Sequence, residues 1–182
     1  VFLHLLKRIE DGKINVNNKI VISDKNSNLI ELYKNIQNNV EELIKKLNEF
    51  KTVYNEAKVI EYPKRFKYQI DLHEEIKKVQ LKGKSHVYYY YRTLYNNTED
   101  ELTKASLLLF LNKTCFRGLY REGKNGFNVP FGNYKNPKIF CETQLMSLSE
   151  LFKKYNIEFH CKDFKSICKN IHAGDFVYFD PP

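Results

Sequence analysis

Residues 19 to 36 read KIVISDKNSNLIELYKNI, and this stretch decides the fold class. Its first five residues form a compact run rich in β-branched side chains, which predicts a buried strand with Asp24 at its carboxyl end. Apolar residues then recur at the 3.6-residue period of a helix, which Ser27 is placed to cap. A strand, an acid and a helix in this order are typical of a doubly wound α/β sheet.

The flanking segments extend this alternation in both directions. Apolar spacing predicts helices over residues 1–9, 40–54 and 145–152, strands over 157–161 and 175–179, and a short helix over 164–171. We therefore expect a Rossmann-like α/β domain built from residues 1–55 and 141–182, with an insertion over residues 56–140.

The first half of the insertion is expected to be helical. Strand signals vanish, and the segment HVYYYYR (86–92) favours a helix packed on several sides. Successive helical residues point about 100° apart, so these four rings do not form one base-stacking platform. Thr98 with Glu101 three residues later predicts a capping box at the start of the next helix.

Residues 112–138 read NKTCFRGLYREGKNGFNVPFGNYKNPK, the most unusual stretch of the chain. It contains four of the seven glycines, and the turn signal GKNG predicts a β-hairpin or compact loop. Six Lys or Arg residues against one Glu give this stretch +5 of the total charge of +8. Such a positive field favours a polyanion such as nucleic acid, although lysine-rich surfaces also serve solubility.

Composition excludes several classes of protein. With 182 residues and 42% hydrophobic residues, the chain is long and apolar enough for a folded domain with a modest insertion. No segment approaches the roughly 20 apolar residues of a membrane span, and the opening residues lack a signal-peptide cleavage site. We therefore expect an intracellular protein, in the cytoplasm, nucleoid or a viral factory, with no membrane partner.

The four cysteines are Cys115, Cys141, Cys161 and Cys168. They form neither a C-x-x-C motif nor a Cys/His cluster, so we expect reduced thiols and no metal site. Because the sequence starts inside an apolar segment and stops at Asp-Pro-Pro after an apolar run, we also expect a fragment of a longer protein.

Asp24 and Asp180 each follow a predicted parallel strand. Ligands of open α/β sheets bind at the carboxyl ends of the strands, where an acid commonly accepts hydrogen bonds from the ribose of a nucleotide-like cofactor. A helix cap is an equally good interpretation of Asp24.

The tripeptide Asp180-Pro181-Pro182 suggests a more specific chemistry. The prolines restrict the backbone, so the carboxylate and a proline carbonyl become a rigid pair of acceptors. Such a pair can grip an exocyclic amine and leave its nitrogen lone pair less conjugated with the ring, as methylation of an aromatic amine requires. The alternative is a turn that simply ends a strand.

Together these motifs resemble the Dam-type (D12 class) DNA adenine-N6 methyltransferases, which use S-adenosyl-L-methionine. The likeness is strongest over residues 112–138. VYFDPP (177–182) resembles the family's catalytic motif and SDKNSNLI (23–30) its second cofactor segment, so nearly the whole chain is covered.

The resemblance implies a role for each matching residue. Asp24, Asp163, Phe164 and Asp180 would bind the cofactor, and Asp180, Pro181 and Pro182 would form the catalytic motif around the target adenine. In the insertion, Arg121 matches a guanine-reading position, Phe116 a wedge beside the flipped adenine, and Leu119, Pro130 and Tyr134 neighbouring base contacts. The full set of implied DNA-binding residues is Phe116, Arg117, Leu119, Arg121, Asn128, Pro130, Tyr134 and Lys135.

The implied function is site-specific N6-adenine methylation of double-stranded DNA, with a cognate restriction endonuclease as a candidate partner. The family's Gly-rich cofactor loop and the aromatic after Pro182 are missing, so we expect the 182-residue chain alone to be inactive and its full-length parent active. Arg117 stands where the GATC-methylating branch commonly has Asn, which leaves the target sequence open. Two alternatives are a catalytically inactive DNA-binding paralogue or specificity module, and methylation of an amine in RNA or protein.

Overall fold

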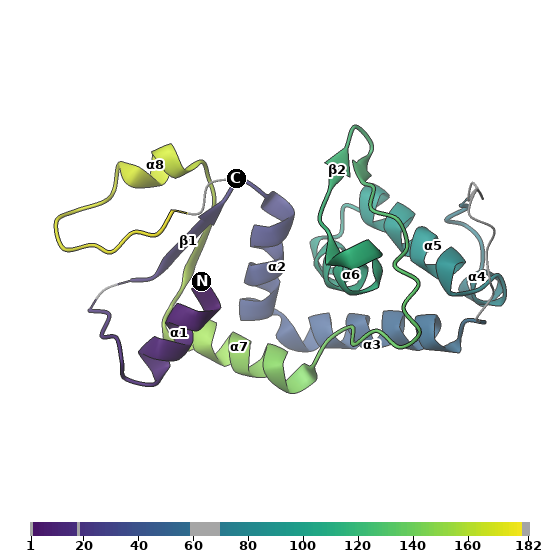
Figure 1. Ribbon diagram of the computed structural model, residues 1–182, viewed down its shortest axis with the longest axis horizontal. Helices are drawn as coiled ribbons and strands as arrows, with labels where there is room; N and C mark the ends of the chain where they lie inside the picture. Colours follow the sequence, from purple (N-terminus) through teal and green to yellow (C-terminus); the bar gives the residue numbers. More distant parts are fainter. Residues whose placement is uncertain (1, 18, 59–69, 180–182) are drawn as a thin grey trace.

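The computed structural model describes residues 2–17, 19–58 and 70–179, as a mixed α/β protein (Figure 1). The elements run in the order α1 (Phe2–Glu10), β1 (Val21–Asp24), α2 (Ser27–Asn38), α3 (Val40–Glu56), α4 (Ile76–Leu81), α5 (Lys84–Asn97), α6 (Glu101–Thr114), η1 (Phe116–Gly118), β2 (Glu122–Gly123), β3 (Gly126–Phe127), α7 (Glu142–Lys154), β4 (Glu158–Cys161) and α8 (Phe164–Cys168). None of the helices in these ranges combines the length and the apolar character that a bilayer span requires.

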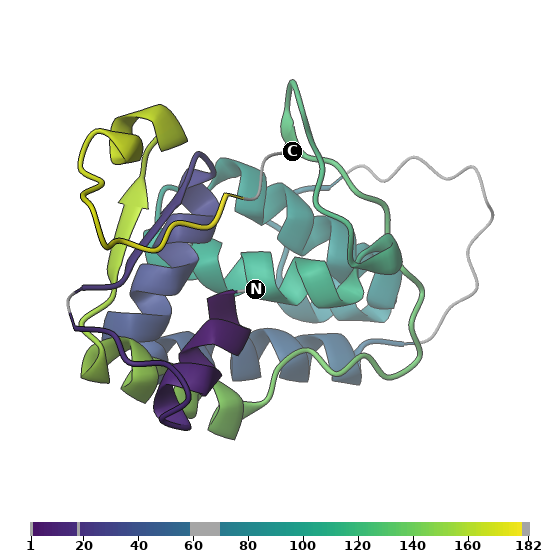
Figure 2. The ribbon, with the colours of Figure 1, turned by 60° about the vertical axis from the view of Figure 1, so that its left-hand side comes forward.

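The predicted strands β1 and β4 are confirmed and pair in parallel. Their register runs from Val21 opposite Glu158 to Asp24 opposite Cys161. Aromatic rings bind this pair to the surrounding helices: Phe159 of β4 lies 5.4 Å from Tyr33 of α2 and 5.1 Å from Phe152 of α7, between ring centroids. Figure 2 shows α1, α2 and α7 beside the strands. Residues far apart in the sequence therefore form one small α/β unit.

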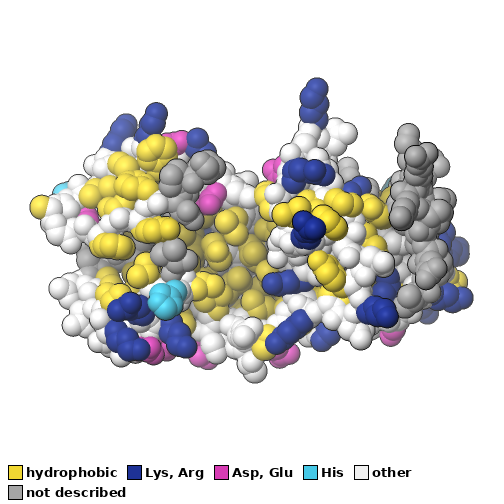
Figure 3. Space-filling model, in the orientation of Figure 1, with side chains coloured by type: hydrophobic (Ala, Val, Ile, Leu, Met, Phe, Trp, Pro, Cys, Tyr) yellow, Lys and Arg dark blue, Asp and Glu magenta, His cyan; other side chains and the backbone are white. Residues whose placement is uncertain are grey.

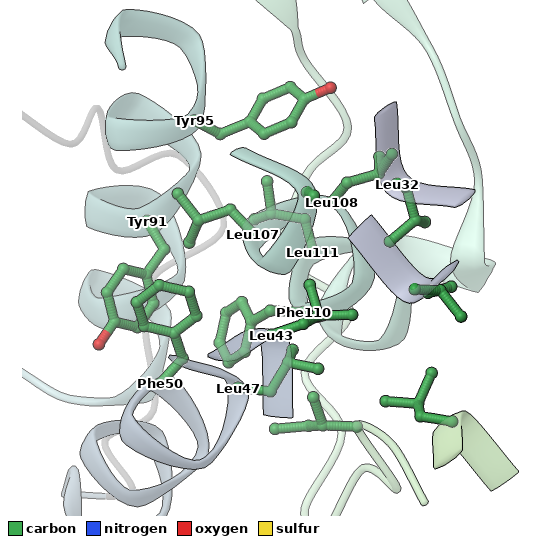
Figure 4. Close-up of a cluster of buried hydrophobic side chains, with 14 of the residues drawn as sticks. Leu32, Leu43, Leu47, Phe50, Tyr91, Tyr95, Leu107, Leu108, Phe110 and Leu111 are labelled. Carbon is green, nitrogen blue, oxygen red and sulfur yellow. The ribbon is translucent and has the colours of Figure 1, made fainter. Parts of the chain in front are cut away.

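The helices predicted in the insertion are also confirmed, and they pack around α6. Phe110 of α6 is fully buried, with its ring 5.1 to 6.3 Å from those of Phe50, Tyr54 and Tyr91 (Figure 4). Since α3 contributes Phe50 and Tyr54 here and also contacts α7, the core continues from the helices toward the strands. The proposed division at residues 55/56 and 140/141 stays a prediction.

The tyrosine run lies on α5 and is packed on several sides, as expected. Tyr88, Tyr91 and Tyr95 are buried, whereas Tyr89 and Tyr90 are half-buried. Burial raises the pKa of Tyr54 to about 12 and raises that of Tyr91 further, so both phenols stay neutral.

The prediction of a buried strand over residues 175–179 is wrong. This segment has no strand pairing within the described chain, and Phe176 is 79% exposed. A buried strand needs a hydrogen-bonding neighbour and apolar cover on its faces, and the described residues supply neither here. Apolar composition alone therefore led to the wrong prediction of a buried strand here.

Two predicted helix caps are also corrected. Asn26, and not Ser27, caps α2, because its side chain accepts a hydrogen bond from the Leu29 N–H at 3.1 Å. Asp100, and not Thr98, caps α6 through the Thr103 N–H at 3.0 Å, while the Thr98 N–H closes the end of α5 on Leu94. In both cases two residues of capping type stand close together, and backbone geometry selects between them.

Candidate functional site

The carboxyl ends of β1 and β4 lie side by side and bring two of the predicted cofactor segments together. The Ser23 hydroxyl donates a hydrogen bond to the Lys162 carbonyl at 2.9 Å, and the Lys25 ammonium lies 2.6 Å from the Asp163 carboxylate. Asp24 and Asp163 thus stand at one edge of the parallel pair, where ligands of α/β sheets bind.

Asp24 is exposed, and its hydrogen bonds show whether it caps α2. Its Oδ1 accepts a hydrogen bond from the Asn26 N–H at 2.7 Å, while the Asn26 side chain itself caps α2. The carboxylate is therefore held by the residue that begins the helix, and it faces solvent in a fixed orientation. A helix-cap role for Asp24 is wrong.

Asp163 and Phe164 begin α8. The Asp163 carboxylate accepts a hydrogen bond from the Lys165 N–H at 2.9 Å. The hydrogen bond from Lys25, and then that from the Lys165 backbone, lower the pKa of Asp163, so the group is ionised at neutral pH. The Phe164 ring is 56% exposed, with its edge toward Phe179 at a centroid distance of 6.0 Å.

Asp180, Pro181 and Pro182 lie outside the described residues. The residue before them, Phe179, contacts Phe164 at the start of α8. The chain thus enters the Asp-Pro-Pro motif from a position beside the segment that carries Asp163.

The eight predicted DNA-binding residues belong to η1, to the confirmed hairpin β2–β3 or to the segments that flank them, and this hairpin projects from the helices in Figure 1. All eight are exposed: Phe116, Arg117, Leu119, Arg121, Asn128, Pro130, Tyr134 and Lys135. Figure 3 shows Lys and Arg side chains gathered on and around this projection. We call residues 116–135 the recognition hairpin.

Backbone contacts close the base of the recognition hairpin. The Phe116 N–H donates to the Pro130 carbonyl at 2.8 Å, and the Arg117 N–H donates to the Tyr134 hydroxyl at 3.1 Å. Gly132 permits this closure, since a Cβ there would lie 2.5 Å from the Cys115 carbonyl oxygen. Residues from both ends of the motif are thereby brought onto one surface.

Two arginines of this surface are already positioned. The Arg121 Nε donates to the Asn128 side-chain oxygen at 2.6 Å, which fixes the plane of the guanidinium. The Arg117 guanidinium lies over the Phe116 ring at 5.1 Å, and Arg117 adopts a left-handed backbone with φ of 55°. Pre-organised arginines of this kind suit the planar recognition of base edges.

Four residues of α5 that were not predicted as functional hold the recognition hairpin in place. The Tyr88 hydroxyl and the Arg92 guanidinium donate to the Val129 carbonyl at 2.8 and 3.1 Å. The Asn96 amide pairs with both the N–H and the C=O of Phe127, at 2.9 and 3.0 Å. The fourth, Tyr89, accepts a hydrogen bond from the Phe131 N–H at 3.4 Å.

We call Tyr88, Tyr89, Arg92 and Asn96 the α5 ladder. It binds alternate residues of an extended segment, so that Phe127 and Val129 point inward while Asn128 and Pro130 face solvent. Tyr88, Arg92 and Asn96 share one helix face at a spacing of four residues, but Tyr91 and Tyr95 have the same spacing, so the spacing alone does not mark the ladder.

Replacing Asn96 with alanine is expected to destabilise the recognition hairpin by about 1 kcal/mol, because the N–H and the C=O of the buried Phe127 both lose the Asn96 side chain as a partner. Faster amide hydrogen exchange at Phe127 would report this change. The control is Asn97→Ala, which removes an exposed amide bonded only within its own helix at Thr93. Unchanged amide exchange at Phe127 in the Asn96→Ala variant would contradict the role of Asn96 in holding the hairpin.

Among the residues with assigned positions, no three His, Cys, Asp or Glu side chains gather closely enough to hold a metal ion. All four cysteines are unpaired, and Cys115 is buried at the base of the recognition hairpin, where burial raises the pKa of its thiol. The polar groups of the site are thus carboxylates, amides, hydroxyls and arginines.

The chain matches known proteins over almost its whole length. A family described as D12 class N6 adenine-specific DNA methyltransferase matches residues 8–182. The type II methyltransferase M.MjaIII of Methanocaldococcus jannaschii is 37% identical over 100% of this chain and 54% of its own length. The type II methyltransferase M1.LlaDCHI of Lactococcus lactis subsp. cremoris is 33% identical over 90% of this chain and 49% of its own.

A third relative, the DNA adenine methylase of Escherichia coli K12, is 38% identical over 53% of this chain and 34% of its own length. The chain therefore spans about half the length, or less, of these relatives. The family match extends through the carboxyl edge of β1, the recognition hairpin and the Asp-Pro-Pro motif. The chain belongs to the D12 class of N6 adenine-specific DNA methyltransferases.

Proposed function

We propose that the protein carrying this chain transfers a methyl group from S-adenosyl-L-methionine to N6 of adenine in a short double-stranded DNA site. The observation that carries the proposal is the placement of two surfaces along the same edge of the molecule. The acid-bearing ends of β1 and β4 and the basic recognition hairpin both lie along the upper edge of Figure 1.

The residues at the carboxyl ends of the strands suit the proposed cofactor. Asp24 offers an exposed, oriented carboxylate to a ribose, and the exposed Phe164 ring offers a flat apolar face to an adenine. Asp163, held as an anion by Lys25, fixes the start of α8 next to that ring. When bound, S-adenosyl-L-methionine supplies a methyl group on an electrophilic sulfonium.

The target amine would be held by the Asp-Pro-Pro motif. The Asp180 carboxylate and the Pro181 carbonyl are acceptors for the two hydrogens of adenine N6, and Pro182 keeps the backbone rigid. Accepting both hydrogens leaves the nitrogen lone pair less delocalised and more nucleophilic. Asp180 would also lie near the cofactor, since Phe179 contacts Phe164.

The recognition hairpin would bind the duplex. Arg121 is held in plane by Asn128 for two hydrogen bonds to guanine, and Leu119, Pro130 and Tyr134 are exposed for contacts with neighbouring bases. Flipping a base costs a few kcal/mol, which insertion of the exposed Phe116 ring would offset. Lys135 and Arg117 add positive charge for the phosphates.

Two of the relatives are named type II methyltransferases, which supports a role in restriction and modification beside a cognate endonuclease that cuts the same site. The protein would then act inside the cell, where duplex DNA is found. An alternative is a paralogue that keeps the recognition hairpin without catalysis.

The test is methyl transfer by the intact protein from labelled S-adenosyl-L-methionine to duplex DNA, followed by digestion to nucleosides. We expect N6-methyladenine from the intact protein and none from the 182-residue chain alone. Label on another base, or on single-stranded RNA in preference to DNA, would overturn the proposal. Duplex binding without affinity for S-adenosyl-L-methionine would instead favour the inactive paralogue.

Replacing Arg121 with alanine is expected to reduce discrimination between the cognate site and a site with one substituted base by about 1–3 kcal/mol, or roughly 5- to 150-fold. The reason is loss of a guanidinium that Asn128 has already oriented. The ratio of kcat/KM on the two duplexes measures the effect.

Arg121→Lys is the matched control for Arg121→Ala, because it keeps the charge but not the planar pair of donors. We expect the lysine variant to retain most of the general affinity for DNA and to lose discrimination. Full discrimination in the lysine variant would mean that Arg121 contributes only charge.

A further inference from the structure

A polar contact joins the recognition hairpin to the first turn of α2. The Asn28 amide donates a hydrogen bond to Glu122 Oε1 at 3.4 Å, and the Tyr120 hydroxyl donates to the same carboxylate oxygen. Glu122 follows Arg121 directly in the chain and is the only acidic residue between 112 and 138. Its charge is therefore directed toward α2.

The hairpin side of this contact is firmly held. The Tyr120 ring packs on Phe127 at a centroid distance of 5.8 Å, and Phe127 is buried and bound through its backbone by Asn96. Burial, and then the hydrogen bond to Glu122, raise the pKa of Tyr120, so the phenol remains a donor at neutral pH.

On the α2 side of this contact, Asn28 lies close in the chain to the proposed cofactor site at Asp24. Asn28 lies in the turn that Asn26 caps, and the N–H of Asn26 donates to the Asp24 carboxylate at 2.7 Å. Glu122 is therefore separated from Asp24 by one short turn of backbone. Cofactor binding at Asp24 and DNA binding at Arg121 would each restrain an opposite end of the same contact.

We propose that the hydrogen bonds of Glu122 to Asn28 and Tyr120 couple cofactor binding at Asp24 to DNA binding by the recognition hairpin. This inference rests on the proposed function. Glu122 is assigned as a positioning residue, because it would act through its chain neighbour Arg121 and its hydrogen-bond partner Asn28 and not by binding a ligand itself. When one ligand restrains this contact, the other ligand loses less conformational entropy on binding and so binds more tightly. Thermodynamic linkage requires the cofactor and the DNA to strengthen each other's binding by the same factor.

The experiment measures, in the intact protein, the Kd for a cognate duplex with and without saturating S-adenosyl-L-homocysteine, an unreactive probe of the cofactor site. We expect the probe to tighten DNA binding by about five-fold or more. The coupling ratio is the Kd for DNA without the probe divided by the Kd with it. In the Glu122→Ala variant this ratio should fall to within about two-fold of one, and it should fall equally in Asn28→Ala.

Glu122→Gln is the decisive companion variant. Like Glu122→Ala, it removes the negative charge of Glu122, but it keeps a side-chain oxygen that can accept hydrogen bonds from Asn28 and Tyr120. It should therefore retain the parental ratio. Glu150→Ala, an equal change of charge at an exposed position on α7, should also leave the ratio unchanged.

A parental ratio of one, an unchanged ratio in Glu122→Ala, or equal losses in the alanine and glutamine variants would each overturn the coupling. Failure of the proposed function is distinguishable, because the parent would then fail to bind the probe, duplex DNA or both. If both ligands bind and only the ratios disagree, the coupling alone is wrong.

Discussion

Replacing Asp180 with alanine in the intact protein is expected to lower methyl transfer to duplex DNA by about 10²–10⁴-fold, the range of a lost group that acts directly on the reacting atom. Without the carboxylate, adenine N6 keeps its lone pair delocalised into the ring and is a poor nucleophile. The single-turnover rate with saturating cofactor and DNA measures this effect, because it separates chemistry from binding and product release.

Asp175→Ala is the matched control for Asp180→Ala, five residues earlier in the same segment. Asp175 accepts a hydrogen bond from the His172 N–H at 2.8 Å in an exposed turn, so its loss should leave the single-turnover rate near the parental value. An Asp180→Ala variant that transfers methyl groups at the parental rate would remove Asp180 from the catalytic motif.

The sequence predicted those parts of the fold whose signals are local. The run KIVISD was sufficient for β1 and for the placement of Asp24 at its end, and 157–161 predicted β4 in the same way. Apolar residues over 175–179 carry a similar signal, but strand formation depends on pairing with a neighbour elsewhere in the chain. Local pattern is therefore informative about a strand only when its partner is present.

In the candidate site, too, the features with local sequence signals were predicted, and the contacts between distant residues were not. The motif of residues 112–138 predicted the hairpin and its concentration of positive charge, because turn glycines and charge are local features. The eight candidate residues came from the family resemblance, and all of them are exposed. The α5 ladder and the bond from Asn28 to Glu122 were not predicted. They join helix side chains to backbone and carboxylate groups 31 to 94 residues away, and such pairings follow from tertiary packing alone.

The core beneath the recognition hairpin provides the largest expected effect on stability. Phe110→Ala is expected to reduce the free energy of unfolding by about 3–5 kcal/mol, since it empties a fully buried site among Phe50, Tyr54 and Tyr91. For a chain of this size the midpoint of thermal unfolding should fall by about 6–20 °C. Calorimetry or urea titration measures the change.

Phe176→Ala is the matched control for Phe110→Ala, because it removes the same side chain from a position that is 79% exposed, and it should change the free energy of unfolding by less than about 0.5 kcal/mol. Phe110 lies one turn before Thr114, where α6 ends and the recognition hairpin begins. The Phe110 variant should therefore also bind duplex DNA less tightly at temperatures below its midpoint. Equal losses of stability in the two variants would mean that the packing around α6 is not the core that supports the recognition hairpin.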